Sequence, residues 1–169
     1  IGSYNMKHPL HIKVGKFLQQ CTKDVILDRA CGGFHNVPLF VETQKANDTE
    51  ICNVDALILS SNTVRVIVEV EEANIKPTQI CGKFFTSALA KYYIYQNIHA
   101  MLKRVHFIQI VSSKKLPICS KKKIQLENIA DRVQELCKNG VFQNIQNYHL
   151  LWDDDKGLQR KIVDIYGRL

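Results

Sequence analysis

The chain has 169 residues and a mass of 19.4 kDa, with 46% hydrophobic and 23% charged residues. These proportions exclude wholesale disorder, and no apolar run approaches the ~18 residues of a membrane span, so no membrane partner is expected. We therefore predict one compact domain over residues 1–169.

Six cysteines are spread along the chain without a CxxC pair. In a chain of this size they are expected to be reduced, core-filling thiols, which predicts a cytoplasmic protein. The histidines show no zinc spacing beyond a weak His8…His11, so a structural zinc site is not expected. No secretory pattern opens the chain, and because it starts at Ile1 we expect tag residues or trimming, with Met6 as the candidate start.

The first half of the chain predicts one helix and three strands. Apolar residues fall at helical spacing from Leu10 to Val25, which indicates an amphipathic helix. A short strand is predicted over residues 37–42, after a break at Cys31-Gly32-Gly33. Two β-rich runs, 52–59 and 63–71, then flank a turn-prone Ser-Ser-Asn and predict a hairpin.

The second half alternates helices and strands. Pro77 suits the first turn of a helix whose apolar face runs to about Gln96. A strand, a second amphipathic helix, a further strand and a tail helix are predicted over 105–111, 122–139, 148–152 and 155–167. The order predicts a mixed α/β (α+β) fold in which a mixed central sheet is flanked by helices, with a core over about residues 8–112 and a C-terminal part over 121–169.

Positive charge is concentrated in one part of the sequence. The net charge is +7, and no Asp or Glu occurs between Glu72 and Glu127. This distribution predicts contact with a polyanion such as DNA. The Lys-rich segment 113–123 is expected to be an exposed loop that reaches the backbone. The lysines that we expect to bind DNA are Lys76, Lys114, Lys115, Lys121, Lys122 and Lys123; the alternative is that they only solvate helix faces and loops.

The predicted hairpin brings carboxylates together. Side chains alternate along a strand, so Glu69 and Glu71 share one face. With a three-residue loop at 61–63, the numbers of opposed residues sum to 124, which places Asp55 opposite Glu69. Arg65 lies ~13 Å along the strand from Glu69, too far to neutralise it. Crowded carboxylates repel each other and raise each other's pKa, so we expect a bound divalent cation to neutralise them.

Mg²⁺ suits these hard oxygen ligands, and Mn²⁺ is expected to substitute for it. The alternative is a solvated strand face whose carboxylates fan into water. Against that alternative, Asp55 is embedded between Val54 and the apolar run Ala56-Leu57-Ile58-Leu59, a poor place for mere solvation.

Asp55, followed after thirteen residues by Glu69-Val70-Glu71 in a helix–three-strand–helix–strand order, resembles the PD-(D/E)xK nuclease superfamily. That superfamily includes type II restriction endonucleases and archaeal junction resolvases. The resemblance implies that Asp55, Glu69 and the backbone carbonyl of Val70 bind Mg²⁺, and that the hydrolysed bond is a DNA phosphodiester.

The sequence departs from the family pattern in the motif itself. Val54 replaces the motif's proline, and Glu71 stands where the lysine is expected. Similar restriction enzymes carry Glu at this position. Alternatively the positive charge comes from the following helix, where Gln79 and Lys83 are four residues apart and share a face; an ordinary solvated pair remains the other interpretation.

The resemblance implies a Mg²⁺-dependent endonuclease of restriction type, acting as a homodimer so that two sites cut two strands. Glu71 would hold a second metal or the attacking water and act as general base, and Lys83 would lie near the scissile phosphate or replace the missing lysine. A junction resolvase or repair nuclease is the alternative enzyme. A DNA-binding module that kept the fold and lost catalysis is the alternative outside the enzymes.

Overall fold

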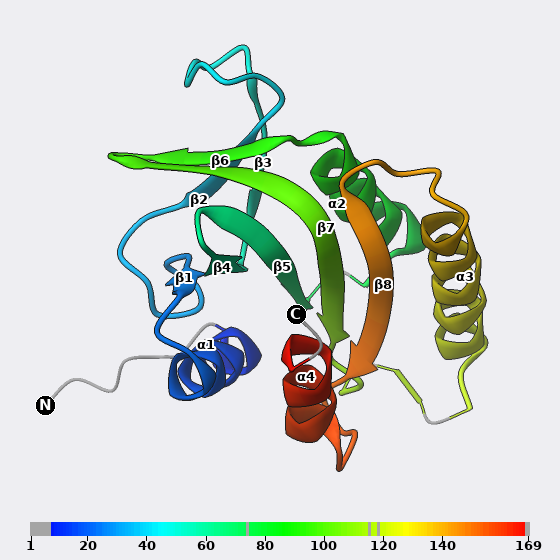
Figure 1. The fold of residues 1–169 in the computed structure, drawn as a ribbon. Coiled ribbons are helices and arrows are strands. Elements are labelled where there is room, and N and C mark those ends of the chain that lie inside the picture. The colour runs from blue at the N-terminus through cyan, green and yellow to red at the C-terminus, as the bar shows by residue number, and fades with distance from the viewer. Residues whose placement is uncertain (1–7, 74, 115, 118, 168–169) are drawn as a thin grey trace, which may run out of the picture.

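The computed structural model describes residues 8–73, 75–114, 116–117 and 119–167. Two predictions, the start at Met6 and the DNA contact of Lys115, fall outside these residues. Within them, four helices flank one mixed eight-stranded sheet (Figure 1), so the predicted mixed α/β fold class is confirmed. None of the helices in these ranges has the length and apolar character needed to cross a bilayer.

The elements have the following bounds. The helices are α1 Pro9–Cys21, α2 Pro77–Leu89, α3 Lys121–Lys138 and α4 Leu158–Tyr166. The strands are β1 Val25–Leu27, β2 Val37–Phe40, β3 Glu50–Val54, β4 Ala56–Ser60, β5 Thr63–Glu71, β6 Tyr92–Tyr95, β7 Ile98–Val111 and β8 Ile145–Trp152.

The sheet combines an antiparallel and a parallel part. The strand order is β1-β4-β5-β7-β6-β2-β3, and β8 pairs with β7. β1, β4 and β5 are antiparallel neighbours, whereas β5, β7 and β8 run parallel to one another. α2 makes the crossover from β5 to β7, and the carboxyl ends of the three parallel strands therefore lie at the same end of the sheet (Figure 1).

Apolar side chains cover both faces of the sheet. α1 and α4 pack on one face through residues such as Leu18 and Ile162, which meet Val66, Val68 and Val70 of β5. α2 and α3 pack on the other face, where Phe84 and Cys137 join a second cluster. Alternate side chains of β5 thus pack into the two clusters on opposite faces of the sheet. Glu69 and Glu71 lie at the carboxyl end of this strand.

The predicted extension of the first helix to Val25 is wrong. α1 ends at Cys21, Thr22 is extended with a φ of −156°, and its side-chain oxygen accepts a hydrogen bond from the backbone N–H of Asp24. This local bond competes with the helix, and Val25 pairs with Ile58 in the sheet instead. The sequence prediction missed β1, the edge strand beside β4, and five strands rather than the predicted three lie between α1 and α2.

The predicted helix from Pro77 to Gln96 is also too long. α2 ends at Leu89, and the tyrosine-rich segment Tyr92–Tyr95 forms β6, which pairs with β7 through a turn at Gln96. Aromatic residues favour strands, but their apolar spacing here also continues the helical pattern. As a result β7 begins at Ile98, well before the predicted start at residue 105.

The predicted strand over 52–59 is interrupted at Asp55. β3 precedes it and pairs with β2, while β4 follows it and pairs with β1 and β5. The hairpin turn consists of Ser61 and Asn62, both with positive φ, rather than three residues. A bulge at Arg65 compensates, and Ala56 pairs with Val68 in the predicted register.

Candidate active site

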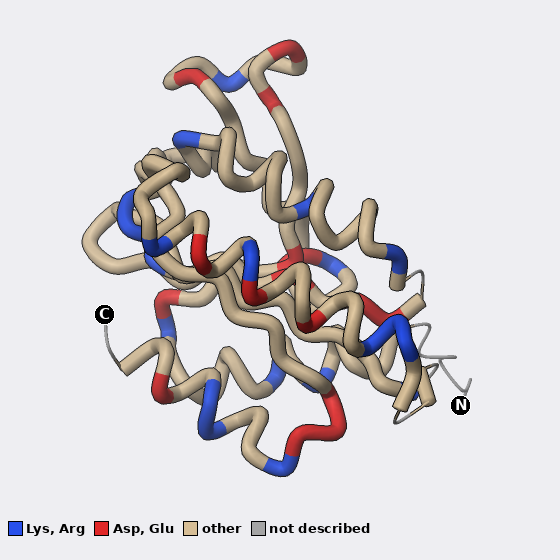
Figure 2. Tube along the Cα trace, turned by 90° about the vertical axis from the view of Figure 1, so that its right-hand side faces the viewer, with Lys and Arg blue, Asp and Glu red and all other residues tan. Residues whose placement is uncertain are grey.

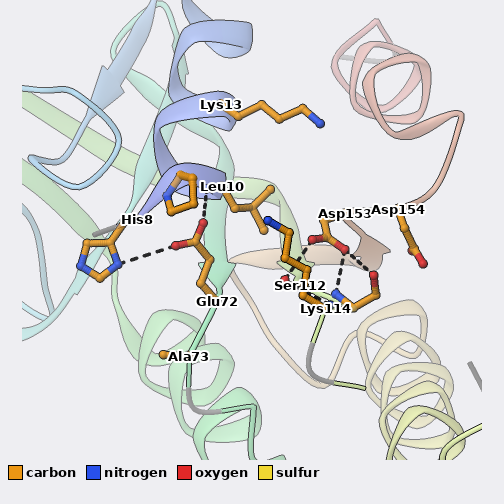
Figure 3. A pocket seen from close by; sticks show the side chains of 11 residues that line it. His8, Leu10, Lys13, Glu72, Ala73, Ser112, Lys114, Asp153 and Asp154 are labelled. Atoms are coloured by element: carbon orange, nitrogen blue, oxygen red, sulfur yellow. Dashed lines mark hydrogen bonds and ion pairs between the residues drawn. The ribbon is translucent and has the colours of Figure 1, made fainter. Parts of the chain in front are cut away.

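A cavity of about 520 Å³ opens at the carboxyl ends of the parallel strands (Figure 3). Glu72 and Ala73 follow β5, Ser112 and Ser113 follow β7, and Asp153 and Asp154 follow β8; all of them line it. The first turns of α1 supply His8 and Lys13. In open sheets with parallel strands, ligands bind in crevices at this end, which marks the cavity as the place to look for chemistry.

Beside this cavity, Asp55 and Glu69 form a buried carboxylate pair. The charge of Asp55 acts on Glu69, and the backbone N–H of Val70 donates to Oδ2 of Asp55 over 2.7 Å. Glu69 is only 2% exposed and Asp55 9%. The break between β3 and β4 turns Asp55 toward β5, and the restored register completes the approach.

The two carboxyl groups of this pair have opposite pKa shifts. Burial raises the pKa of Glu69 well above its ordinary value, and the charge of Asp55 raises it further, although Lys83 opposes the shift. Burial also acts to raise the pKa of Asp55, but hydrogen bonds from His11 and the Val70 N–H outweigh it, so this pKa is lowered. Of the two carboxyl groups, Glu69 therefore holds a proton more readily than Asp55.

Lys83 of α2 provides the counter-charge on the other side of Glu69. Its Nζ lies 3.2 Å from Oε2 of Glu69 and 3.0 Å from Oε1 of Glu71. Burial acts to lower the pKa of Lys83, but the two glutamates together raise it, so the ammonium stays charged. Part of the neutralisation that the sequence analysis assigned to a divalent cation thus comes from the chain itself.

Glu71 is embedded in a buried polar network. Nε2 of Gln109 donates to Oε1 of Glu71 over 3.1 Å, and the hydroxyl of Tyr148 donates to Oε1 of Gln109 over 2.8 Å. Glu71 is 3% exposed and Gln109 is fully buried. The same oxygen of Glu71 therefore serves both Gln109 and Lys83, which fixes the carboxylate and leaves it little freedom to move.

Two residues that the sequence analysis missed complete the acidic cluster. Nε2 of His11 lies 3.6 Å from Oδ2 of Asp55, and its Nδ1 lies 3.3 Å from Oε2 of Glu72. Burial acts to lower the pKa of His11, but Asp55 and Glu72 outweigh it and the pKa is raised. Glu72 also accepts the backbone N–H groups of Leu10 and His11, which joins the end of β5 to the start of α1 (Figure 3).

A glycine allows α1 to come this close. Gly15 lies one turn after His11, and a Cβ built on it would sit 2.0 Å from the carbonyl oxygen of Cys31. Only a residue without a side chain permits this contact between α1 and the loop after β1. The position of His11 against Asp55 depends on that contact, since Gly15 and His11 lie on the same face of α1.

His8, His11 and Glu72 offer ligand atoms within 4.8 Å of one another, and no other group of three among the described residues does so. Asp55, Glu69 and Glu71, the three predicted carboxylates, do not form such a group. The His8…His11 spacing at a helix start was the available sequence signal. The third ligand, Glu72, lies 61 residues beyond His11, and only the fold brings it there.

The remaining predicted residues lie apart from the carboxylate pair. Gln79 is exposed and, in the part of the chain that is described, makes no hydrogen bond with Asp55, Glu69 or Glu71. Lys76 is also exposed. Lys114 lines the cavity at the end of β7 (Figure 3).

The other lysines belong to α3. Lys121, Lys122 and Lys123 form its first turn, so the predicted loop over 113–123 ends at Ser120, whose side chain accepts the N–H of Lys123. Figure 2 shows blue at this end of α3 and mixed red and blue along the rest of the helix. Nζ of Lys123 lies 4.9 Å from the ring centre of Trp152, which lies at the end of β8.

The chain was compared with protein families, with curated proteins and with solved structures, and nothing matches in any of the three comparisons. The function of the site is therefore inferred from its own chemistry. It combines a buried carboxylate pair, a charged lysine and a histidine next to a cavity that carries further lysines.

Proposed function

We propose that this protein is a Mg²⁺-dependent DNA endonuclease of the PD-(D/E)xK type. The observation that carries the proposal is the contact between Asp55 and Glu69, with the Lys83 ammonium 3.2 Å from Glu69. Two acids from neighbouring strands and one lysine are the parts that the family motif requires. The antiparallel neighbours β1, β4 and β5, followed by α2 and β7, support the same proposal, because they resemble the helix–three-strand–helix–strand core of the family with β2, β3 and β6 as additional strands.

The carboxylate pair fits a hard divalent cation. Asp55 and Glu69 would hold Mg²⁺ with the backbone carbonyl of Val70, and Mn²⁺ would substitute. A bound Mg²⁺ supplies an activated water and neutralises charge on the phosphate. Because the cation binds the ionised carboxylate, the raised pKa of Glu69 makes the affinity for the cation rise with pH.

In this proposal Lys83, and not Glu71, takes the role of the motif lysine. The ammonium of Lys83 reaches the first motif glutamate from α2 and is held there by Glu71. Glu71 is then a positioning residue, because its Oε1 already accepts from Lys83 and Gln109. This geometry favours Lys83 over the general-base role that the sequence pattern suggested for Glu71.

The lysines near the cavity are proposed to contact the DNA backbone. Three consecutive lysines in the first turn of α3 oppose the helix macrodipole, which favours acids at that position. An external polyanion removes this conflict, and Lys114 offers a further contact inside the cavity. We further propose a cytoplasmic homodimer, in which two sites cut two strands. A junction resolvase or repair nuclease would use the same site.

Incubation of plasmid DNA with the protein and Mg²⁺ or Mn²⁺ tests the proposal. Discrete bands would indicate a sequence-specific endonuclease, a smear a non-specific one, and cutting of cruciforms alone a resolvase. Asp55→Ala and Glu69→Ala are expected to abolish cleavage while DNA binding, measured by gel shift, survives. Asp154→Ala is the matched control, because Asp154 lines the same cavity but is exposed.

Two results would contradict the proposal. Cleavage that is unchanged in both Asp55→Ala and Glu69→Ala removes the site assignment. Binding of DNA without cleavage under any metal condition leaves the DNA-binding module as the function.

A further inference from the structure

The neighbouring strands β5, β7 and β8 each have an irregularity in their pairing near their amino-terminal halves. Arg65 is an extra residue of β5 between Val64 and Val66, which pair with β4 and β7 on either side. The pairing of β7 with β5 passes from Leu102 to His106, and that of β8 with β7 skips Gln146. Arg104, inside the β7 irregularity, has a φ of 53° in the left-handed region.

The residues at these irregular positions line the same cavity. Its volume is about 430 Å³, and Arg65, Arg104 and Gln146 all contribute to its wall. β-bulges redirect side chains, and they are common next to functional sites. Here three of them, on adjacent strands, direct two guanidinium groups and one amide to one place.

The wall of this cavity is strongly basic. Lys138 of α3 adds a third cation, His106 and His149 stack with a ring distance of 5.5 Å, and none of the lining residues is Asp or Glu. Within the described residues, no carboxylate lies within 4.0 Å of Arg65, Arg104 or Lys138. The cations are therefore brought together without a counter-charge from the described chain.

The described residues make few hydrogen bonds with the two arginines. Nε of Arg104 donates to Oε1 of Gln146 over 3.2 Å, which orients its guanidinium. Nε of Arg65 is buried and has no hydrogen-bond partner in the part of the chain that is described. The guanidinium groups of Arg65 and Arg104, together with the ammonium of Lys138, form a set of donors that matches a multivalent oxyanion.

We propose that this cavity is a binding site for a phosphate group, carried either by a small phosphorylated molecule or by a nucleic-acid backbone. The planar guanidinium donates two parallel hydrogen bonds to phosphate oxygens, and two such groups with Lys138 neutralise its charge. The site does not depend on the proposed nuclease function. It lies at the opposite end of β5 from Glu69 and contains none of the proposed metal ligands.

Binding measured in EDTA tests the site without any cleavage. Isothermal titration of the full chain with pyrophosphate, with AMP and with a short DNA duplex separates the two sources of phosphate. The exposed Arg104→Gln and Lys138→Gln variants are the main tests, since half-buried Arg65 could be needed for folding. Arg29→Gln, the same change at an exposed arginine in the loop after β1, is the control.

Arg104→Gln is expected to weaken the binding of at least one phosphate probe by about tenfold, and Arg29→Gln to leave it unchanged. Loss of pyrophosphate or AMP affinity identifies a small phosphorylated ligand. Loss of duplex affinity alone identifies a backbone phosphate. If no probe binds the wild type up to about 10 mM, or if Arg104→Gln and Lys138→Gln bind every probe as the wild type does, the site is not a phosphate site.

Discussion

The two ends of the parallel strands β5, β7 and β8 handle charge in opposite ways. At the carboxyl end, Glu69 and Glu71 are buried and paired with Lys83, and Asp55 is paired with His11. At the amino end, Arg65 and Arg104 meet without a carboxylate from the described chain within 4.0 Å. The acidic end is thus neutralised by side chains of the protein, whereas among the described residues no carboxylate pairs with the two arginines of the basic end.

This difference follows from what each end has to do in our proposals. A catalytic site benefits when its side chains are held in place before the substrate arrives, because no reorganisation is then needed during reaction. The hydrogen bonds of Asp55 to the Val70 N–H and of Glu71 to Gln109 provide this order. A phosphate site instead gains affinity from cations whose charge is not already satisfied.

Among the variants that keep both proposed metal ligands, the largest effect is expected from Lys83→Ala, which should lower the rate of Mg²⁺-dependent cleavage by about 10³-fold. The proposed motif lysine would be lost, while phosphate binding at the basic cavity should not change. The measurement is kcat/KM for DNA cleavage, with Lys91→Ala as the control because Lys91 is exposed before β6. If Glu71→Gln costs more activity than Lys83→Ala, Glu71 rather than Lys83 fills this role.

Gly15→Ala is expected to reduce the free energy of unfolding by about 3 kcal/mol, because its Cβ would sit 2.0 Å from the Cys31 carbonyl oxygen. The substitution should displace His11 from Asp55 at the acidic end. The basic cavity should be unaffected. Gly82→Ala in α2 is the control, since nothing lies within 4 Å of its added Cβ; it should gain about 1 kcal/mol. Urea denaturation measures both changes, and equal stabilities would disprove the role of Gly15.

The same contrast explains what could be predicted from the sequence. Beyond Arg65, β5 is regular, so simple alternation placed Glu69 and Glu71 on one face. The register of Asp55 was predicted from a three-residue loop, yet the structure reaches it through a two-residue turn and a bulge at Arg65. The shorter turn and the bulge shift the register in opposite directions and cancel. No local pattern in the sequence predicts either of them.

Other features were not accessible from local patterns. Glu72 caps α1 and contacts His11 only because the fold brings together segments 61 residues apart. Tyr92–Tyr95 continues the apolar spacing of α2, so period alone could not separate β6 from the helix. Arg65 and Arg104 meet because bulges break the alternation on which strand predictions depend.

Substitution of Lys121, Lys122 and Lys123 by Gln is expected to weaken DNA binding by about tenfold and to flatten its salt dependence. Each lost phosphate contact lowers the slope of log K against log salt by about 0.9. Comparison with Arg104→Gln tells whether the basic cavity or the first turn of α3 dominates backbone contact. A triple variant whose salt slope equals that of the wild type would remove these lysines from the DNA interface.

The smallest predicted effect is that of Glu69→Gln on the free energy of unfolding, and here the substitution should stabilise the protein. The folded-state pKa of Glu69 lies above its ordinary value of 4.5, so the folded protein binds more protons than the unfolded chain. The free energy of unfolding therefore falls as the pH rises above 4.5 toward the raised folded-state pKa. In EDTA at pH 8, Glu69→Gln should be more stable than the wild type by about 1 kcal/mol, with no difference at pH 4.

Asp55→Asn is the matched control for this experiment, because the pKa of Asp55 is lowered below its ordinary value of 3.8. Its stabilising contribution is present above pH 3.8 and lost as the pH falls through the lowered folded-state pKa, so Asp55→Asn should destabilise the protein at pH 8. Mg²⁺ should stabilise the wild type and neither variant, since binding to the folded state alone raises stability. A Glu69→Gln variant that is less stable than the wild type at pH 8 would contradict this prediction. It would show that Glu69 is ionised in the metal-free protein and that Lys83 and His11 balance the charge of the acidic end.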